Sequence, residues 1–297
     1  MAVIEKKQPV PLMAPTEFLA GSNYNDIPIT LSKWIVRSYR SYLITGDQGS
    51  GKSTYLKSIA RFYEPWIGIR VNEMQPELNL RYAYPNRNIV EFYETPSIST
   101  QDGLNFQKKT SGTVNIIGEI ASAEAASWWV QTTKVASKSG AGTHHGKTID
   151  DTVTAIRDNI MKVDHYSNAD SVEIMVADAL DYDIHMSRDG FRFIERITEV
   201  LPVKQREYPY PNLKAVSEAD MTMALRINQL EYFKRVTDRK NYEEKNICEY
   251  DRDEKRYMFT SMFSDSQIKE IKKNLTKPEY ELFEKDMDRL MTYNPNA

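Results

Sequence analysis

The chain has 297 residues, of which 40% are hydrophobic and 27% charged, a balance typical of a globular protein rather than a disordered one. Its net charge of −3 excludes an overall basic field that would recruit nucleic acid or an anionic membrane, although a local patch could still do so. The single cysteine, Cys248, excludes an intramolecular disulfide framework and a cysteine metal cluster.

Two further observations concern location. No run of the sequence approaches the roughly 18 apolar residues of a membrane span, and the N-terminal residues lack the apolar core of a signal peptide. We therefore expect a cytoplasmic protein without direct membrane insertion. Any association with the cytoplasmic membrane would then be peripheral and would come through a partner.

Composition divides the chain into three parts. Prolines at positions 9, 11, 15 and 28 predict an extended lead-in over residues 1–30. Strong strand and helix patterns follow over residues 31–205, which we expect to form one α/β core. The segment 204–214 has two prolines and several charges, which predicts a linker. Residues 206–297 are richer in charge and are expected to be mainly helical with one hairpin.

Local signals place two turns and a helix in the second half. Asp189 and Gly190 predict a hairpin turn between two strands that close the core. The run 247–260 has the pattern of a second hairpin. Thr276 and Glu279 form a capping box with a proline near the helix start, which predicts a final amphipathic helix.

The segment 42–63 carries the pattern of a phosphate-binding loop, G-x-x-x-x-G-K-[ST], between an apolar strand and an amphipathic helix. Glycines allow backbone N–H groups to curl around phosphates, and the helix N-terminus adds partial positive charge. Lys52 is expected to neutralise the β- and γ-phosphates, and the Ser53 hydroxyl to bind Mg²⁺. The predicted nucleotide-binding residues are Gly46, Asp47, Gln48, Gly49, Ser50, Gly51, Lys52, Ser53 and Thr54.

A second acidic position and two histidines follow downstream. The apolar run 114–120 contains Glu119 directly after a glycine, where a P-loop protein needs a carboxylate that holds Mg²⁺ through water. The alternative is a buried strand with an exposed glutamate at its end. His144 and His145 lie in a turn of small residues, where a neutral ring could sense the γ-phosphate. The alternative is a turn with exposed imidazoles. No cysteine or suitably spaced third ligand accompanies them, so we do not expect zinc.

In their order these motifs resemble the type II/type IV secretion ATPase superfamily, the motors of pili, tight-adherence pili, type II secretion and conjugation. Residues 46–54 match the family's Walker A loop, and residues 69–80 its acidic box. Residues 115–120 match its atypical Walker B motif, and residues 143–151 its His box. The resemblance covers roughly residues 30–203. It implies a RecA-like core, with a mostly parallel sheet flanked by helices, and a largely helical C-terminal appendage.

The resemblance also implies roles for three residues. Glu73 matches the family's catalytic glutamate and would orient the attacking water. Glu119 would hold Mg²⁺ through water together with Ser53, and His145 would sense the γ-phosphate. The implied function is an ATP-hydrolysing, Mg²⁺-dependent motor subunit. It would act as a homohexameric ring on a membrane platform or secretion-channel protein.

Some positions depart from the family's pattern. Met74 stands where an aspartate is usual, Ala121 where an arginine commonly follows the Walker B glutamate, and Lys147 where the His box often has asparagine. Arg81 and Arg87 do not fall on the family's arginine position. Only 45 residues precede the P-loop, where the family usually has a sizeable domain.

Two other functions remain open. One is a DNA-translocating ring NTPase, against which the net charge of −3 argues. The other is a non-hydrolysing nucleotide-binding module for assembly, which the departures at Met74 and Ala121 leave open.

Overall fold

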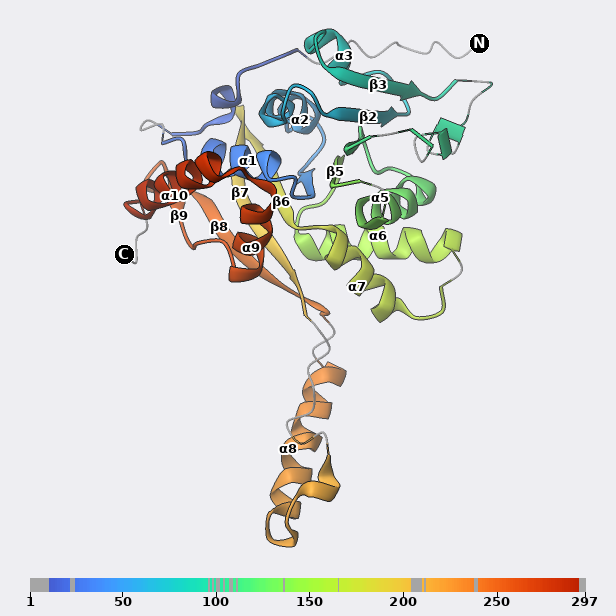
Figure 1. Cartoon of the computed structure of the whole chain (residues 1–297), viewed down its shortest axis with the longest axis vertical. Helices are drawn as coiled ribbons and strands as arrows, with labels where there is room; N and C mark the ends of the chain where they lie inside the picture. The colour runs from blue at the N-terminus through green and yellow to red at the C-terminus, as the bar shows by residue number, and fades with distance from the viewer. Residues whose placement is uncertain are drawn as a thin grey trace.

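The computed structural model describes residues 11–21, 25–95, 97, 99, 102–103, 105–106, 109–110, 112–135, 137–164, 166–203, 210, 212–237 and 240–293. These residues form one nine-stranded sheet with helices on both faces (Figure 1). The strand order is β3-β2-β4-β5-β1-β6-β7-β8-β9. The α/β core with a mostly parallel sheet, expected from the sequence, is therefore confirmed.

The sheet has a parallel and an antiparallel part. From β3 to β6 all neighbouring strands run parallel, and from β6 onward each neighbour runs antiparallel. The β6–β7 pair is joined at Gly190, which has a φ of 72°, so the predicted hairpin turn is confirmed. The strands are β1 (Tyr42–Thr45), β2 (Gly68–Glu73), β3 (Asn88–Tyr93), β4 (Val114–Ile117), β5 (Ser139–His144), β6 (Tyr182–Asp189), β7 (Phe191–Pro202), β8 (Tyr242–Asp251) and β9 (Arg256–Phe259).

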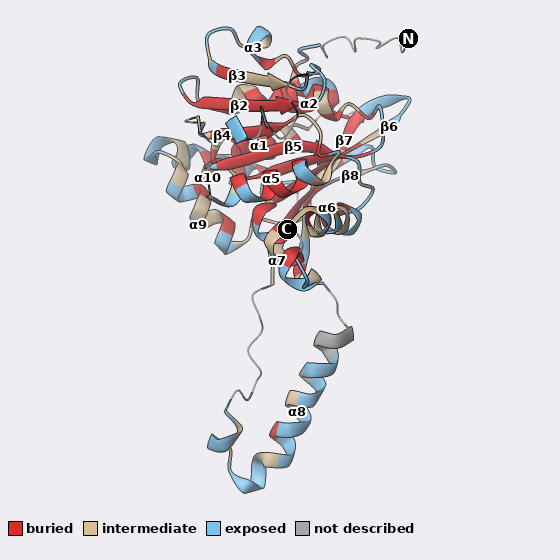
Figure 2. Cartoon of the chain, turned by 90° about the vertical axis from the view of Figure 1, so that its right-hand side faces the viewer, coloured by how far each residue is buried: buried red, intermediate tan, exposed pale blue. Residues whose placement is uncertain are grey.

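Two apolar clusters pack against the two faces of the sheet, whose central strands are buried (Figure 2). One face is covered by α1 (Ile27–Arg37), α2 (Lys52–Ile59), α9 (Asp265–Asn274) and α10 (Lys277–Met291). The other is covered by α5 (Ala123–Val135), α6 (Ile149–Asp164) and α7 (Ala169–Ala179), and Trp128 and Trp129 of α5 are buried in this cluster. The short helices are η1 (Pro15–Phe18), η2 (Ala60–Phe62), α3 (Leu80–Ala83) and η3 (Leu213–Ala215).

The C-terminal region is packed on the core rather than set apart from it. The second hairpin is present as β8 and β9, and β8 pairs with β7, so it extends the same sheet. The capping box of Thr276 and Glu279 begins α10 as expected. Trp34 of α1 packs edge-to-face on Phe283 of α10, with ring centroids 5.6 Å apart. The expected boundary near residue 205 therefore falls within one continuous sheet.

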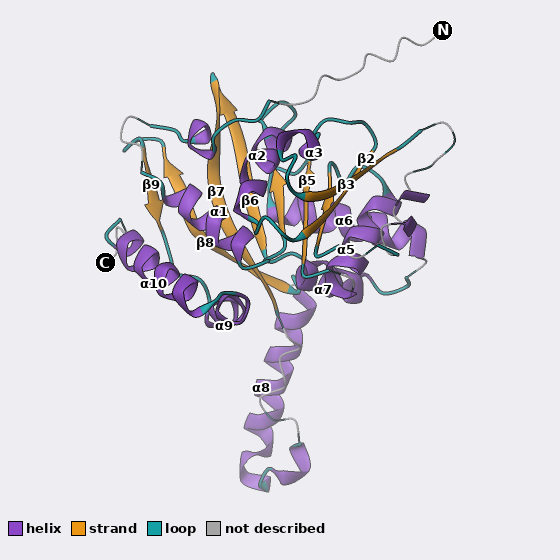
Figure 3. Ribbon diagram, turned by 45° about the horizontal axis from the view of Figure 1, so that its top comes forward, coloured by secondary structure: helices purple, strands orange, loops and turns teal. Residues whose placement is uncertain are grey.

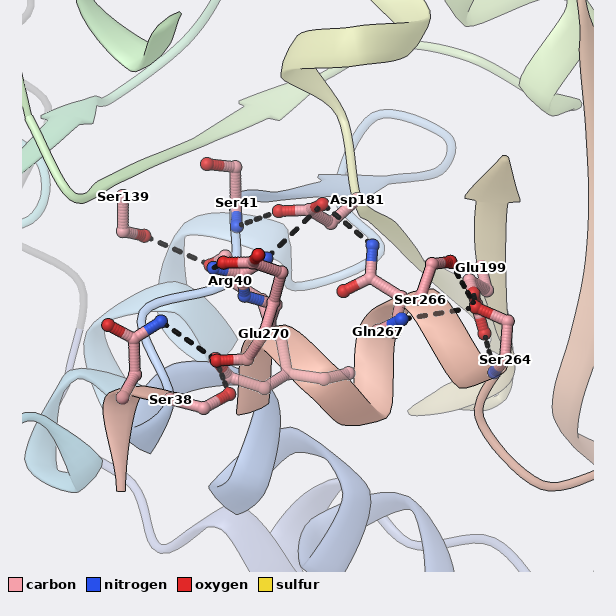
Figure 4. Close-up of polar contacts among 12 residues, drawn as sticks. Ser38, Arg40, Ser41, Ser139, Asp181, Glu199, Ser264, Ser266, Gln267 and Glu270 are labelled. Atoms are coloured by element: carbon pink, nitrogen blue, oxygen red, sulfur yellow. Dashed lines mark hydrogen bonds and ion pairs between the residues drawn. The ribbon is translucent and has the colours of Figure 1, made fainter. Parts of the chain in front are cut away.

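A network of polar contacts fixes α9 to the sheet (Figure 4). The carboxylate of Asp181 accepts hydrogen bonds from the Ser41 backbone N–H and from Gln267 Nε2, both at 2.8 Å. The Ser264 backbone N–H, at the start of α9, donates to Glu199 at 3.0 Å. Asp181 directly precedes β6, and Glu199 lies on β7. These contacts therefore attach α9 to β6 and β7, and β6 is the strand that pairs with β1.

The described part of the lead-in is also packed. Phe18 is 1% exposed, and the hydroxyl of Tyr257 accepts from the Ala20 backbone N–H at 3.1 Å. The same hydroxyl donates to the Ile194 carbonyl at 2.8 Å. One buried tyrosine therefore joins the lead-in, β7 and the C-terminal hairpin.

The helix α8 (Glu218–Thr237) projects away from the sheet as an arm inserted between β7 and β8 (Figures 1 and 3). The predicted linker 204–214 lies largely outside the described residues. The two strands that flank the arm meet at its base, since the Val203 N–H donates to the Asn241 carbonyl at 2.9 Å. Among the described residues, no helix is both long and apolar enough to cross a membrane.

Candidate nucleotide-binding site

The phosphate loop joins the end of β1 to the start of α2, the strand–loop–helix arrangement that its sequence predicts. Gly46, Gly49 and Gly51 all have positive φ, of 134°, 78° and 97°. A side chain at Gly46 would also place its Cβ 2.1 Å from the Met186 carbonyl oxygen of β6. Only glycine combines this backbone conformation with so close an approach. The loop geometry therefore depends on its glycines.

Lys52, the first residue of α2, lies across the loop. Its ammonium nitrogen donates to the carbonyls of Gly46 (3.0 Å) and Asp47 (2.9 Å) and lies 3.2 Å from Nδ1 of His145. Burial lowers the pKa of Lys52, and the nearby carboxylates, led by Glu119, oppose that effect. A lysine has three N–H donors, and these three contacts account for all of them. A phosphate that binds Lys52 must therefore replace one of them.

His145, just after β5, lies between Lys52 and Glu119. Its Nε2 is 3.0 Å from Oε1 of Glu119, the residue that follows β4 and Gly118. Since an ammonium group can only donate, we assign Nδ1 of His145 as the acceptor and Nε2–H as the donor to Glu119. The neutral tautomer thus satisfies both contacts. The side chains of His145 and Glu119 are 47% and 41% exposed, so both are within reach of a ligand.

The preceding histidine has a different environment. His144 is the last residue of β5, is buried, and has Nδ1 3.0 Å from the Ile120 carbonyl oxygen. Burial lowers its pKa, which favours the neutral ring. Neighbouring residues at a strand end point to opposite sides of the sheet. His144 therefore supports the backbone after Glu119, and His145 faces the P-loop.

Glu73, the last residue of β2, is buried. Its Oε1 accepts hydrogen bonds from the backbone N–H groups of Glu77 (3.2 Å) and Leu78 (2.9 Å). Burial raises its pKa to about 7, against the opposing effect of these hydrogen bonds. A Cβ on Gly118 would lie 2.8 Å from the Glu73 Cγ. Glu73, whose side chain lies next to Gly118, therefore holds the segment 74–78 in place.

Glu77 is the carboxylate that faces the P-loop from this segment. Ser53 Oγ lies 3.4 Å from Glu77 Oε2. Glu77 is not among the predicted site residues, although a second glutamate four residues after Glu73 in the acidic box is a signal that could have identified it. Glu77 thus lies beside the Ser53 hydroxyl at the start of α2.

The donor set suits a magnesium ion bound with phosphates. Among the described residues, no three acidic, histidine or cysteine side chains are grouped so that they could hold a metal by themselves. Magnesium in nucleotide sites takes most of its ligands from phosphates and water, with one or two from protein. The hydroxyl of Ser53 and the carboxylate of Glu119 are ligands of the kind that this arrangement needs.

Behind the loop, three buried polar residues connect β1 with β6. Thr45 Oγ1 donates to Asp183 Oδ1 at 2.7 Å and lies 2.8 Å from Nδ1 of His185. Burial raises the pKa of Asp183 to about 6 and lowers that of His185 to about 4. This cluster directly precedes Gly46, so it fixes where the loop begins.

No protein-family model and no curated protein matches the chain. Among solved structures, the VirB11 ATPase of the Brucella suis type IV secretion system, in complex with sulphate, matches with a TM-score of 0.52 and 16% identity over 58% of this chain and 51% of that chain. The Legionella pneumophila ATPase DotB matches with a TM-score of 0.48 and 17% identity over 77% and 63%.

The fold and the loop define an α/β protein of the P-loop class. In fold it resembles the VirB11 ATPase, a component of a type IV secretion system, so the predicted resemblance to this group is confirmed. The chain spans about half the length of that VirB11 structure.

Proposed function

We propose that this chain is an ATP-hydrolysing motor subunit of a secretion, pilus or conjugation machine, with ATP and Mg²⁺ as its ligands. The observation that carries the proposal is that His145 contacts both Lys52 of the P-loop and Glu119, one with each ring nitrogen. These three groups come from α2 and from the ends of β5 and β4. Their meeting at one edge of the sheet is what phosphate binding and its detection require.

In this proposal the P-loop backbone and Lys52 bind the phosphates, and Ser53 and Glu119 hold Mg²⁺, the latter through water. Magnesium, when bound, neutralises charge on the β- and γ-phosphates. His145 changes partners when a phosphate takes the Lys52 ammonium, so it senses the nucleotide. The resemblance assigns the attacking water to Glu73. The contact between Glu77 and Ser53 favours Glu77 for that role, with Glu73 holding the segment that presents it.

The assembly that we propose is a homohexameric ring that drives a membrane platform or secretion-channel protein from the cytoplasmic side. The support is the resemblance of the motifs and of the fold to VirB11. In such a ring, hydrolysis would be coupled to rigid movement between subunits.

The test is ATP turnover by the full chain and by Lys52→Ala. Lys52→Ala removes the only side chain of the loop that neutralises phosphate charge, so we expect loss of hydrolysis. Lys269→Ala, at an exposed position of α9, is the matched control and should keep wild-type turnover. Unchanged turnover in Lys52→Ala would overturn the proposal.

Two further readouts separate the alternatives. Sedimentation with a non-hydrolysable ATP analogue should reveal a nucleotide-stabilised hexamer, and a strict monomer would rule out the ring. Tight ATP binding without phosphate release, at concentrations that allow assembly, would identify a non-hydrolysing module instead. Hydrolysis stimulated by DNA in a salt-sensitive manner would identify a translocase.

A further inference from the structure

The β6–β7 hairpin lies directly against the phosphate loop. Arg192 Nε donates to the Gly49 carbonyl at 3.0 Å. A Cβ on Gly51 would lie 3.0 Å from the Arg192 Cδ, and one on Gly49 would lie 3.4 Å from a terminal nitrogen of Arg188. The hairpin rises past the ends of the neighbouring strands in Figure 3. Arg192 therefore contacts the loop that would cradle phosphates, and Arg188 lies close to it.

The two arginines also face each other. Arg188 and Arg192 are directly opposite in the β6–β7 register, so their side chains share one face of the hairpin. Like charges at such a position are destabilising by themselves. A negative charge beside Arg188 and Arg192 would offset this repulsion.

The nearby carboxylates do not supply that counter-charge. Asp189 and Glu195 of the hairpin pair with Arg252, each at 3.2 Å. Within the part of the chain that the structure describes, neither Arg188 nor Arg192 forms an ion pair, and both are exposed. The Nε bond to Gly49 uses one of the five N–H donors of Arg192 and leaves four for a ligand.

We propose that Arg188 and Arg192 form a cationic clamp that binds the phosphate chain of the nucleotide held by the P-loop of the same subunit. The proposal rests on the proposed function, because it concerns the same loop. Planar guanidinium groups bind phosphate oxygens in a bidentate manner, which a single lysine cannot do. The clamp adds two positive charges, so its contribution to binding grows with the number of phosphates on the ligand.

The experiment measures equilibrium binding of fluorescent AMP, ADP and a non-hydrolysable ATP analogue to the full chain. Arg188→Ala and Arg192→Ala should each weaken binding of the ATP analogue by at least about tenfold, because each removes a charge-assisted contact. ADP should lose less and AMP least. Arg192→Lys keeps the positive charge but loses the planar guanidinium group, so its affinity for the ATP analogue should fall between those of wild type and Arg192→Ala.

Arg252→Ala is the matched control. It removes an arginine that contacts the same hairpin through Asp189 and Glu195 but does not touch the loop, so it should bind all three nucleotides as wild type does. Thermal melting without nucleotide is the second readout. Relief of the like-charge contact should leave the melting temperature of Arg188→Ala unchanged or raise it.

The outcomes separate the two proposals. Unchanged affinities in both alanine variants, with Lys52→Ala still abolishing binding, would overturn the clamp alone. An equal loss for AMP, ADP and the ATP analogue, together with a lower melting temperature, would mean that the arginines only brace the loop, and would also overturn it. Wild-type binding in Lys52→Ala would instead overturn the proposed function.

Discussion

Nδ1 of His145 lies 3.2 Å from the ammonium nitrogen of Lys52. Because lysine can only donate, the ring accepts at Nδ1 and keeps its proton on Nε2, which faces Glu119 at 3.0 Å. A phosphate that draws Lys52 away removes the partner of Nδ1. The same ring also contacts Glu119, so in the proposed function this exchange would link phosphate binding at Lys52 to Glu119.

The two neighbouring histidines should respond differently to alanine substitution. His145→Ala should lower kcat about 10- to 100-fold, and since the side chain is half exposed it should change the free energy of unfolding by less than about 0.5 kcal/mol. His144→Ala should instead destabilise the fold by about 1–3 kcal/mol, because the buried contact with the Ile120 carbonyl is lost. Steady-state kinetics and urea unfolding check both. Equal effects of the two variants on stability would contradict this division.

Substitutions of the two glutamates of the acidic box, Glu73 and Glu77, should have different effects on kcat. Glu77→Gln should lower kcat by about 10²-fold or more with ATP binding retained, because the carboxylate beside Ser53 is neutralised. Glu73→Gln keeps an acceptor oxygen for the N–H groups of the loop and should have the smaller effect on kcat. Single-turnover hydrolysis with nucleotide-binding controls makes the comparison. A larger loss of hydrolysis rate in Glu73→Gln than in Glu77→Gln would indicate that Glu73 orients the attacking water.

Burial of Glu73 should also appear in the pH dependence of stability. Its folded pKa of about 7 exceeds its ordinary value of 4.5, so the folded state holds a proton that the unfolded state releases between these pH values. Glu73 therefore lowers the free energy of unfolding by about 3 kcal/mol as pH rises from about 4.5 to about 7. Glu73→Gln should remove this contribution to the pH dependence of the free energy of unfolding.

The measurement is the difference between wild type and Glu73→Gln in denaturant unfolding at several pH values. Asp183, whose pKa is raised to about 6, acts in the same direction, and His185, whose pKa is lowered to about 4, acts in the opposite one. Both remain in the variant, so they cancel in the difference. Parallel pH profiles for the two proteins would show that Glu73 does not titrate in this range.

The arm should be separable from the core. Residues 204–240 lie between two strands that are already paired at its base, through Val203 and Asn241. We expect that replacing this segment by a short glycine-rich turn leaves the melting temperature within about 3 °C of wild type and leaves ATP binding intact. Calorimetry and nucleotide titration check this. A large drop in melting temperature would show that the arm supports the core.

The sequence predicts the P-loop and its flanking strand and helix well, because glycine chemistry and periodicity are local. It does not distinguish Glu73 from Glu77, because the direction of each side chain depends on tertiary contacts, those of Glu73 with Gly118 and Leu78 and that of Glu77 with Ser53. The two hairpin arginines escape notice for a related reason. They are more than 130 residues from the loop in sequence, and their position depends on β6 lying beside β1.

In residues 206–297, too, local structure could be predicted from the sequence but long-range packing could not. Its hairpin and its capped helix follow from turn chemistry and capping residues, which are local signals. That β8 pairs with β7 and α10 packs on Trp34 follows from contacts between distant segments, which the pattern of a single segment does not contain.

The P-loop strand β1 is the fifth of nine strands, with β5 and β6 hydrogen-bonded on either side of it. His145 directly follows one of these neighbours, β5, and Arg188 lies near the end of the other, β6, with Arg192 opposite it on β7. The amide protons of these three strands should therefore be among the slowest in the molecule to exchange with deuterium. The proposed hydrolysis would then take place beside the most rigid strands, and any motion that accompanies it would have to involve the core as a whole.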